Sequence, residues 1–311
     1  MHGILVVDKP EGPTSHDVVA KVRRALGVAK VGHTGTLDPM ATGVLPLVLG
    51  RATKLARYLT GGDKGYRATI RLGVSTRTLD KQGEVVETRP VPALTAADIE
   101  AALAPLRGRI SQVPPMYSAK KIDGQKLYVL ARKGVDVERE GKPVTVFALD
   151  LVEHDHDRLV VDTRCSAGTY VRVLAEDIGR ALGCGGHLEA LARTAAGPFG
   201  LAEAFALDAL LAEPSLAQAR IMPVETALSA LPRIDLPHDV ARQVQQGYQL
   251  CVADLRLIGA PPFAANDALA VGLSGGQILA VARAELGSDD LPGSRRERRA
   301  LKTERVLASA R

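Results

Sequence analysis

The sequence predicts an α/β protein with a second, smaller β-rich domain. Over about the first 230 residues, short strand-like runs alternate with segments whose apolar residues recur at helical spacing. After about residue 231, prolines separate short strand-like runs. A chain of 311 residues is long enough for two domains with a sizeable core. The periodicity alone does not fix the order of the strands.

Composition favours a globular protein that binds an anionic partner. Apolar residues make up 46% of the chain, and the formal net charge is +5. Cys165, Cys184 and Cys251 are far apart and form no CxxC pair, which argues against a disulfide framework or a zinc site and favours reduced thiols in a cytoplasm. Neither a signal-peptide pattern nor an apolar run of 18 residues occurs, so we expect neither secretion nor a membrane span.

The first elements are a strand, a turn and a helix. Residues 3–7 form an apolar run, and residues 8–13 carry two prolines and a glycine. Thr14 or Ser15 can cap the helix that follows, which ends at Gly27. Lys9 lies in the turn. On its own it is either a solvated turn lysine or part of a site.

Residues 32–50 are the centre of the chain's organisation. This stretch holds four glycines and two prolines around one imidazole, His33, and one carboxylate, Asp38. Pro39 keeps Asp38 out of the α region, so its side chain is presented from extended backbone. Residues 44–49 then return to the core and anchor the loop. Asp38 is therefore either a catalytic acid on a shaped loop or a simple turn cap.

The string GHTGTLDPMATGVLPLVLG resembles the catalytic motif of the bacterial tRNA pseudouridine-55 synthases, a family that isomerises a uridine in the T-arm of tRNA. The resemblance implies that Asp38 is the catalytic residue and that His33 fills the space left in the RNA by the target base. The turn Asp8-Lys9-Pro10, with Gly12 and Ser15, resembles the family's first motif, which packs near the active site. Lys9 is therefore also expected at the RNA site.

After a helix expected over residues 52–60, residues 66–72 alternate as a strand that turns Tyr66 inward. From the strand pattern alone, Tyr66 is interpreted as a core tyrosine. The resemblance of its Lys-x-Tyr-Arg segment implies instead that it stacks on the target uracil and takes part in proton transfer. Residues 76–83 resemble the family's Thr-Asp-Thr-x-Asp-x-x-Gly pattern, with Arg77 in place of an acid. We expect this segment to lie outside the chemistry.

A basic stretch follows at residues 112–134, with a short amphipathic helix that ends at Gly134. A charge run of this kind is usually a solvated face. Its resemblance to the family's Pro-x-Met-Tyr-Ser-Ala-x-Lys segment implies an RNA-gripping insertion at about residues 110–145. The residues expected to contact RNA there are Tyr117, Lys120, Lys121 and Lys126.

Residues 158–165 alternate as a strand, and a helix follows that ends at Gly183. Arg172 lies in the first turn of this helix, where the helix dipole disfavours a cation, so we expect an acidic partner from elsewhere. The resemblance of Gly-Thr-Tyr-x-Arg supplies one, the catalytic aspartate, and places Tyr170 near Asp38 or under the base. Residues 154–157, His-Asp-His-Asp, could bind a metal but read as a hairpin turn.

The remainder of the chain is expected to be a PUA-like RNA-binding domain over residues 231–287, with strands at 250–253, 268–273 and 277–282 and a Ser-Gly-Gly turn at 274–276. Residues 288–311 are expected to be a flexible basic tail, because Arg295, Arg296, Arg298 and Arg299 lie in a polar context. By resemblance, residues 1–230 are the catalytic domain, with a central mixed, mainly antiparallel sheet flanked by helices.

The function implied is isomerisation of uridine 55 in the T-arm stem-loop of tRNA by base flipping, without a metal or other cofactor, in the cytoplasm. Asp38 could attack C1′ or C6, or remove the C2′ proton; the sequence leaves these open. No membrane and no obligatory protein partner is expected. A guide-RNA-dependent synthase shares the motif, although the insertion favours the stand-alone type. An RNA-binding chaperone is the alternative from another class, and a metal-dependent hydrolase is disfavoured by the histidine pattern.

Overall fold

The strands form one large sheet and one small one. The structure, a computed structural model, describes residues 1–118, 120–122, 124–229, 231–273 and 277–307. The large sheet has ten strands and is mixed. Within the described part of the large sheet, only β1 with β14 and β3 with β12 pair in parallel, and in the small sheet β15 pairs in parallel with β16. The predicted fold class, a mixed and mainly antiparallel sheet flanked by helices with a small β domain after it, is confirmed.

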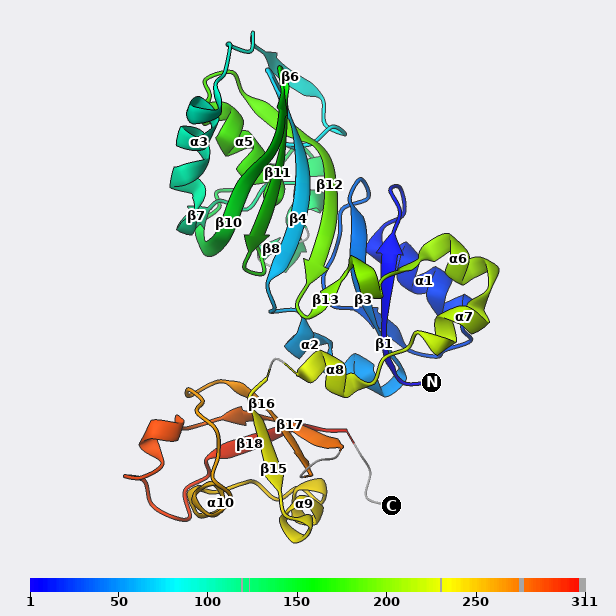
Figure 1. The fold of residues 1–311 in the computed structure, drawn as a ribbon, viewed down its shortest axis with the longest axis vertical. Helices are drawn as coiled ribbons and strands as arrows, with labels where there is room; N and C mark the ends of the chain where they lie inside the picture. The colour runs from blue at the N-terminus through cyan, green and yellow to red at the C-terminus, as the bar shows by residue number, and fades with distance from the viewer. Residues whose placement is uncertain (119, 123, 230, 274–276, 308–311) are drawn as a thin grey trace.

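Figure 1 shows the large sheet running through the upper part of the molecule. Strands β12 and β4 lie at its centre, and the apolar alternation predicted for β4 is present, with Ala68, Ile70 and Leu72 buried. In spatial order the path is β14 (Phe205–Ala206), β1 (Gly3–Lys9), β3 (Thr42–Leu49), β12 (Gly186–Ala196), β4 (Lys64–Leu72), β11 (Arg158–Cys165), β10 (Lys142–Asp155) and β7 (Gly108–Gln112), with β2 (Val31–His33) beside β3 and β13 (Phe199–Gly200) beside β12.

Helices cover one face of each half of this sheet (Figure 1). Helix α1 (Ser15–Ala25) begins at the predicted cap, because Thr14 and Asp17 form a reciprocal capping box. The other helices near this sheet are α3 (Ala96–Leu103), α5 (Val171–Ala181), α6 (Leu207–Ala212) and α7 (Pro214–Ala219). Their apolar sides and the sheet enclose an almost wholly aliphatic core, as expected for a chain with 3% aromatic residues.

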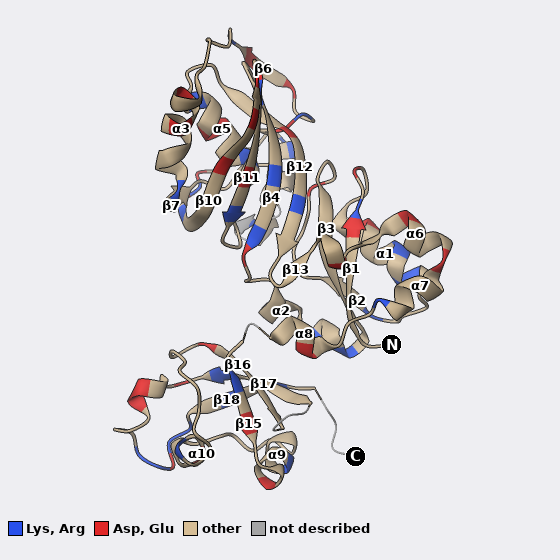
Figure 2. Cartoon of the chain, in the orientation of Figure 1, with Lys and Arg blue, Asp and Glu red and all other residues tan. Residues whose placement is uncertain are grey.

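Strands β4 and β11 also carry charged residues, coloured blue and red in Figure 2, and two exposed ones pair across the strands. Arg67 on β4 donates two hydrogen bonds to Asp162 on β11, at 2.8 and 2.7 Å. The hairpin between β10 and β11 turns at His156, which has φ of 32°. The prediction that residues 154–157 form a hairpin turn is confirmed.

Shorter elements connect the sheet strands. They are η1 (Gly50–Leu55), α2 (Ala56–Leu59), the ribbon β5 (Val74–Thr76) with β6 (Val85–Thr88), η2 (Ala104–Leu106), η3 (Leu201–Glu203) and α8 (Val224–Leu228). Between β7 and β10, where the RNA-gripping insertion is expected, lie β8 (Lys121–Ile122), β9 (Gln125–Lys126) and α4 (Leu127–Arg132). The insertion thus follows the edge strand β7, and the chain re-enters the large sheet in β10, which is the neighbour of β7.

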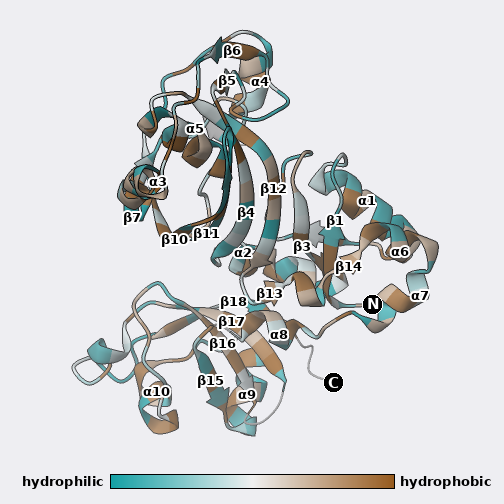
Figure 3. Ribbon diagram, turned by 45° about the horizontal axis from the view of Figure 1, so that its top comes forward, coloured by the Kyte–Doolittle hydropathy of each residue, from teal (hydrophilic) through white to brown (hydrophobic). Residues whose placement is uncertain are grey.

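The smaller sheet has its own core (Figure 3). It orders β15 (Arg233–Leu236), β16 (Ala268–Leu273), β17 (Ile278–Ala284) and β18 (Leu301–Val306), packed with α9 (His238–Gln245), α10 (Val252–Ile258) and η4 (Ser288–Asp290). The strand predicted at 250–253 is wrong. Val252 begins α10, because Asp254 accepts the N–H of Cys251 in a capping box and so favours a helix start. The Ser-Gly-Gly turn predicted at 274–276 lies outside the described residues.

The segment from residue 288 is not a flexible basic tail up to residue 306. Strand β18 pairs with β17 along its length, and Arg299 is paired with Glu285 at 2.5 Å. From β18, Glu304 accepts hydrogen bonds from Arg57 at 2.9 Å and from Tyr58 at 2.6 Å, both on α2. The segment therefore closes the small sheet and joins it to the first 230 residues.

Candidate active site

A cavity of about 310 Å³ lies where the Asp38 loop meets the start of β4 and the start of α5. Loop residues 35–38 form one wall, and residues 167–172 form the other. The charged or hydroxyl-bearing side chains that line it are Thr36, Asp38, Thr60, Lys64, Tyr66, Ser118, Thr169, Tyr170, Arg172 and Arg193. Of the sequence-predicted residues, the cavity thus brings together Asp38, Tyr66, Tyr170 and Arg172.

Two buried side chains shape the Asp38 loop from below. Lys9, at the end of β1, is fully buried and donates to the carbonyls of Pro10, Pro39 and Ala41 at 2.9, 3.1 and 2.6 Å. Ser15 Oγ accepts the N–H of Leu37 at 2.8 Å. These bonds fix the backbone on both sides of Asp38. Burial lowers the pKa of Lys9 to about 8.

The expectation that Lys9 contacts RNA is therefore wrong for this structure, and so is the reading as a solvated turn lysine. An ammonium group with 0% exposure has no surface to offer a phosphate. Its three N–H groups match three carbonyl oxygens, which is the full donor capacity of a lysine. Lys9 supports the loop rather than the substrate.

Arg172 joins the two walls of the cavity. Its Nε lies 3.1 Å from Asp38 Oδ2, so the expected acidic partner is present. The guanidinium also reaches Asp80 Oδ2 at 3.3 Å and donates to the carbonyls of Thr78 and Tyr117 at 3.1 and 2.9 Å. Together these interactions fix the orientation of the guanidinium group, and only 7% of the Arg172 side chain is exposed.

Asp80 was missed by the sequence analysis, which placed residues 76–83 outside the chemistry. Thr78 Oγ1 and the N–H of Gln82 donate to Asp80 Oδ1 at 2.6 and 3.0 Å, so the carboxylate is itself fixed. The sequence feature that could have pointed to Asp80 is the acid at the fifth position of the Thr-x-Thr-x-Asp pattern. Arg77, the departure that drew attention, pairs with Glu84 at 3.4 Å on the surface.

The electrostatics of Asp38 reflect two opposing effects. Burial raises the pKa of this carboxyl group, and the charge of Asp80 adds to the rise. The charges of Arg172 and then of Lys9 lower it. The side chain is 40% exposed, and that exposure opens into the cavity. Asp38 is thus a carboxylate that is surrounded by protein yet accessible to a ligand.

Tyr66 and Arg193 form the floor of the cavity. Arg193 lies opposite Tyr66 in the pairing of β12 with β4, and it is 1% exposed. Burial raises the pKa of Tyr66, and Arg193 opposes this rise by its charge and by a polar contact with the phenol. Lys64, two residues before Tyr66, is also buried, and burial lowers its pKa to about 8. Neither cation is among the site residues predicted from the sequence.

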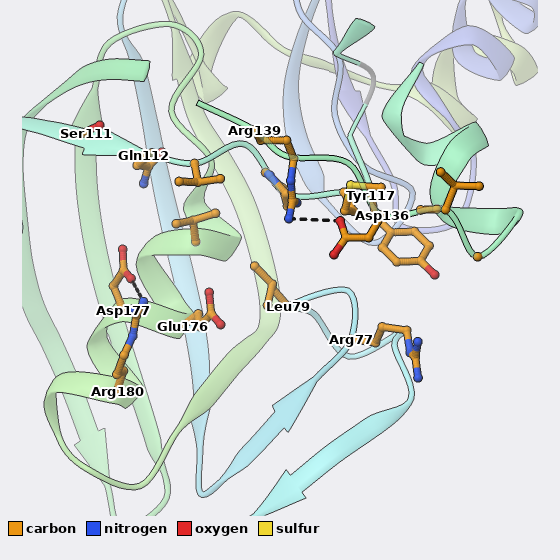
Figure 4. A pocket seen from close by; sticks show the side chains of 17 residues that line it. Arg77, Leu79, Ser111, Gln112, Tyr117, Asp136, Arg139, Glu176, Asp177 and Arg180 are labelled. Atoms are coloured by element: carbon orange, nitrogen blue, oxygen red, sulfur yellow. Dashed lines mark hydrogen bonds and ion pairs between the residues drawn. The ribbon is translucent and has the colours of Figure 1, made fainter. Parts of the chain in front are cut away.

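Tyr170 and Tyr117 are placed differently. Tyr170 lines the cavity as the cap residue of α5, and its N–H donates to Gln112 Oε1 at 3.0 Å. Tyr117 gives its carbonyl to Arg172, but its side chain lines a separate, larger cavity of about 570 Å³ between α5 and the insertion. Figure 4 shows that cavity, with Arg139 paired to Asp136 and Asp177 paired to Arg180 on its walls.

The larger cavity is not the better candidate for chemistry. Its walls carry charges of both signs, and in each of the two ion pairs, Arg139 with Asp136 and Arg180 with Asp177, one partner is mostly exposed. By contrast, in the smaller cavity a buried arginine on one wall aims an accessible carboxylate on the other. Burial also raises the pKa of Glu176 and Asp177 in the larger cavity, so what distinguishes the smaller one is the buried Arg172 beside Asp38.

His33 and the insertion lysines lie around this site. His33, on β2, accepts the N–H of Gly35 through Nδ1 at 3.3 Å, and its ring meets that of His16 edge-on at 5.2 Å. Burial lowers the pKa of His33. Lys120 borders a cavity of about 230 Å³ next to Tyr170. The backbones of Lys121 and Lys126 pair in β8 and β9, but their side chains lie outside the described residues.

Two further features concern ligands and membranes. Among the described residues, no group of three or more His, Cys, Asp or Glu side chains is arranged around a possible metal position. The helices of the described part are also too short or too polar to cross a bilayer. What the site itself offers is an aimed carboxylate, a phenol and a buried arginine around an open cavity of about 310 Å³.

Comparison with known proteins gives a consistent result along most of the chain. Residues 23–171 match the TruB family pseudouridylate synthase (N terminal domain), and residues 172–229 match the tRNA pseudouridylate synthase B C-terminal domain. A tRNA pseudouridine synthase B of Aromatoleum aromaticum is 51% identical over 79% of this chain and 80% of its own. One of Burkholderia pseudomallei is 46% identical over 92% of this chain and 94% of its own.

Solved structures agree in fold. A chain of a Cbf5-Nop10-Gar1 complex matches with a TM-score of 0.80 and 26% identity, over 99% of this chain and 85% of that chain. A chain of an H/ACA RNP bound to a substrate RNA containing 2′-deoxyuridine matches with a TM-score of 0.76 and 25% identity, over 98% of this chain and 85% of that chain. The likeness therefore extends through both sheets.

Proposed function

The chain belongs to the TruB family of pseudouridylate synthases, and from this premise we propose that it isomerises uridine 55 in the T-arm loop of tRNA to pseudouridine. The observation that carries the proposal is the ion pair between Asp38 and Arg172, which joins the two walls of an open cavity. The relatives at 46% and 51% identity are named tRNA pseudouridine synthase B, which favours tRNA over a guide-RNA system. The Cbf5 complexes are more distant in sequence.

The reaction breaks the bond between C1′ and N1 and forms one between C1′ and C5 of the same base. C5 loses a proton and N1 gains one, so no electrons and no external group are exchanged. Asp38 acts as nucleophile at C1′ or C6, or as base at C2′. Each route needs an ionised carboxylate, which burial opposes and Arg172 favours. Arg172 also aims the carboxylate by its position between the two walls.

The uridine must leave the RNA stack to reach Asp38. Flipping costs a few kcal/mol, and stacking on Tyr66 offsets about 1–3 kcal/mol of that. Tyr66 also exchanges protons with the base: its phenol gives a proton to N1 and takes the one that C5 loses. His33 fills the space left in the RNA, while Tyr170 borders the base. Lys120, Lys121, Lys126 and Tyr117 hold the RNA outside the cavity.

We assign catalysis to residues 1–230, the RNA grip to the insertion at about 110–145, and further RNA binding to the PUA-like part at 231–287. The grip by lysines would position the T-arm without reading its sequence. No partner protein is required by this assignment. Cys165, Cys184 and Cys251 are free thiols, which fits the reducing conditions of the cytoplasm.

The test is tritium release from T-arm stem-loop RNA labelled at C5 of uridine, in the presence of EDTA. Wild type should release tritium, and Asp38→Asn should release none while its Kd for the RNA stays within about tenfold, because phosphate contacts dominate affinity. Asp162→Asn is the matched control, since Asp162 is also paired with an arginine but lies outside the cavity. Turnover by Asp38→Asn would exclude Asp38 as the catalytic residue. RNA binding without release by any variant would favour a chaperone.

A further inference from the structure

Arg193 is a buried cation without an acidic partner. It is 1% exposed, and within the described residues it forms no ion pair with a carboxylate. Burying an uncompensated charge is costly, so its neighbours must stabilise it by other means. Burial accordingly lowers the pKa of Arg193, although an arginine stays protonated. A buried charge at the floor of this cavity must therefore be stabilised by specific neighbours.

Carbonyl oxygens supply the stabilisation. Nε donates to Val44 at 2.7 Å, and the two terminal nitrogens donate to Gly35 at 3.1 Å and to Thr36 at 3.3 Å. Gly35 and Thr36 precede Asp38, whereas Val44 follows it on β3. The guanidinium therefore ties both flanks of the Asp38 loop to β12. Because carbonyls are neutral, the positive charge itself is not cancelled.

The remaining neighbour is the phenol of Tyr66. The strand register sets Arg193 opposite Tyr66, and the guanidinium interacts with the phenolic oxygen by charge and by a polar contact. An arginine can only donate hydrogen bonds, so the oxygen of Tyr66 is the acceptor. The hydroxyl proton of Tyr66 is consequently left to point away from Arg193, toward the cavity.

We infer that Arg193 is a positioning residue of the isomerisation: it fixes the Asp38 loop against β12 and stabilises the negative charge that develops on the Tyr66 oxygen during proton transfer. The inference rests on the proposed function. When Tyr66 gives its proton to N1, its oxygen becomes anionic, and it returns to the phenol when it takes the proton from C5. A nearby fixed cation stabilises that anion without reorganisation. No proton is gained or lost overall.

A double-mutant cycle separates this role from simple support of the fold. Single-turnover conversion of C5-labelled T-arm RNA at saturating enzyme is measured for wild type, Tyr66→Phe, Arg193→Gln and the double variant. Arg193→Gln keeps hydrogen-bond donors but removes the charge. We expect it to slow wild type by ten- to a hundredfold and to slow the Tyr66→Phe background by less than about threefold, because no phenolate forms there. Equal loss in both backgrounds would mean that Arg193 acts only through the Asp38 loop, and it would overturn the inferred role at Tyr66.

Two further variants keep the outcome decisive. Arg193→Lys retains the charge and should recover most of the rate lost in Arg193→Gln; if both lose the same rate, charge at this position does not assist Tyr66. If Arg193→Gln fails to fold, Arg193→Lys can be measured in its place in both the wild-type and the Tyr66→Phe backgrounds. Arg67→Gln, on the outer face of β4, is the matched control and should leave the rate unchanged. If wild type released no tritium, the proposed function itself would fail, whereas active wild type without coupling would refute only this inference.

Discussion

Arg172 Nε lies 3.1 Å from Asp38 Oδ2, which joins the start of α5 to the loop between β2 and β3. A cation in the first turn of a helix is disfavoured by the helix dipole, so this position is costly unless acids surround it. The two carboxylates of Asp38 and Asp80 supply that compensation. They differ in exposure: Asp80 is buried and fully bonded, and Asp38 faces the cavity. Asp80 therefore acts as the structural partner that leaves Asp38 free for substrate.

Asp80→Asn should reduce the single-turnover rate by about tenfold or more and should also lower the free energy of unfolding. Asparagine keeps an oxygen for Thr78 and Gln82 but gives up one charge-assisted bond to Arg172, a loss of about 1.5–3 kcal/mol. Arg172 then aims Asp38 less well. Tritium release and thermal unfolding measure the two effects. Asp162→Asn, which loses an exposed arginine pair, is the control, and an unchanged rate in Asp80→Asn would contradict this account.

The same variant should change the pH dependence. Burial and Asp80 raise the pKa of Asp38, so activity should fall on acidification at a higher pH than for an ordinary aspartate, as protonation removes the reactive form. Removing the charge of Asp80 lowers the pKa of Asp38. The acid limb of the rate profile of Asp80→Asn should thus move to lower pH while its plateau falls. A limb that stays in place would mean that another group titrates there.

At the alkaline side, Lys9 sets a second limit. Its pKa of about 8 means that a rise in pH through 8 removes one of three N–H donors that hold residues 10, 39 and 41. The rate should fall above pH 8, and Lys9→Gln should show a lower rate without this limb. Lys64 titrates in the same range, so Lys64→Gln is the control and should keep the limb if Lys9 causes it.

Stability should respond to that titration with the opposite sign. The pKa of Lys9 is lower in the folded chain than the 10.4 of a free lysine, so between about pH 8 and 10.4 the unfolded chain binds more protons. Under that condition, the contribution of this group to the free energy of unfolding rises with pH. Chemical denaturation of wild type and Lys9→Gln at pH 7.5 and 9.5 isolates the contribution. A loss of stability specific to wild type at pH 9.5 would contradict it.

The sequence predicted the central features because they depend on local pattern. The alternation of residues 66–72 indicates which way Tyr66 faces, and the dipole argument demands an acid for Arg172. Lys9 was ambiguous because the same Asp-Lys-Pro turn can face water or the core. Only the pairing of β1 with β3 decides, by bringing the Pro39 and Ala41 carbonyls above the ammonium group.

Other features depend on contacts between distant segments, which periodicity does not encode. Arg193 and Tyr66 are neighbours only through the register of β12 with β4. Asp80 enters the site because residues 76–83 fold back on α5. Near the end of the chain, the arginine-rich composition led to the prediction of a flexible tail where the structure has β18. This strand has a weak sequence preference for β structure and is stabilised by its pairing with β17 and its contact with α2. Val252 likewise starts a helix because of a single cap.

Ser15→Ala tests the support of the Asp38 loop separately from helix stability. Ser15 Oγ accepts the Leu37 N–H in the protein interior, so its removal leaves a buried donor unsatisfied and should cost about 1–3 kcal/mol. Thr14→Ala removes the cap of the same helix at a similar cost of about 0.5–2 kcal/mol, but the side chain of Thr14 bonds to Asp17 within the helix and not to Leu37. We expect both to lower Tm and only Ser15→Ala to lower the rate. Equal rates would mean that the Leu37 bond does not position Asp38.

Gly43→Ala tests how closely the end of the loop packs on β12. Gly43 has φ of +96°, and a Cβ there would lie 2.3 Å from the carbonyl oxygen of Arg193, which is backbone and cannot yield easily. Gly27 also has a positive φ, +61°, but a Cβ there meets no atom within 4 Å. Gly27→Ala should cost about 1–2 kcal/mol from conformation alone, and Gly43→Ala about 3 kcal/mol or more because a close contact is added. Urea unfolding gives both values.

Gly43→Ala should also slow single turnover, because Arg193 lies at that contact, whereas Gly27→Ala should not. Equal losses of stability and of rate in the two variants would show that β3 approaches β12 less closely than the structure implies.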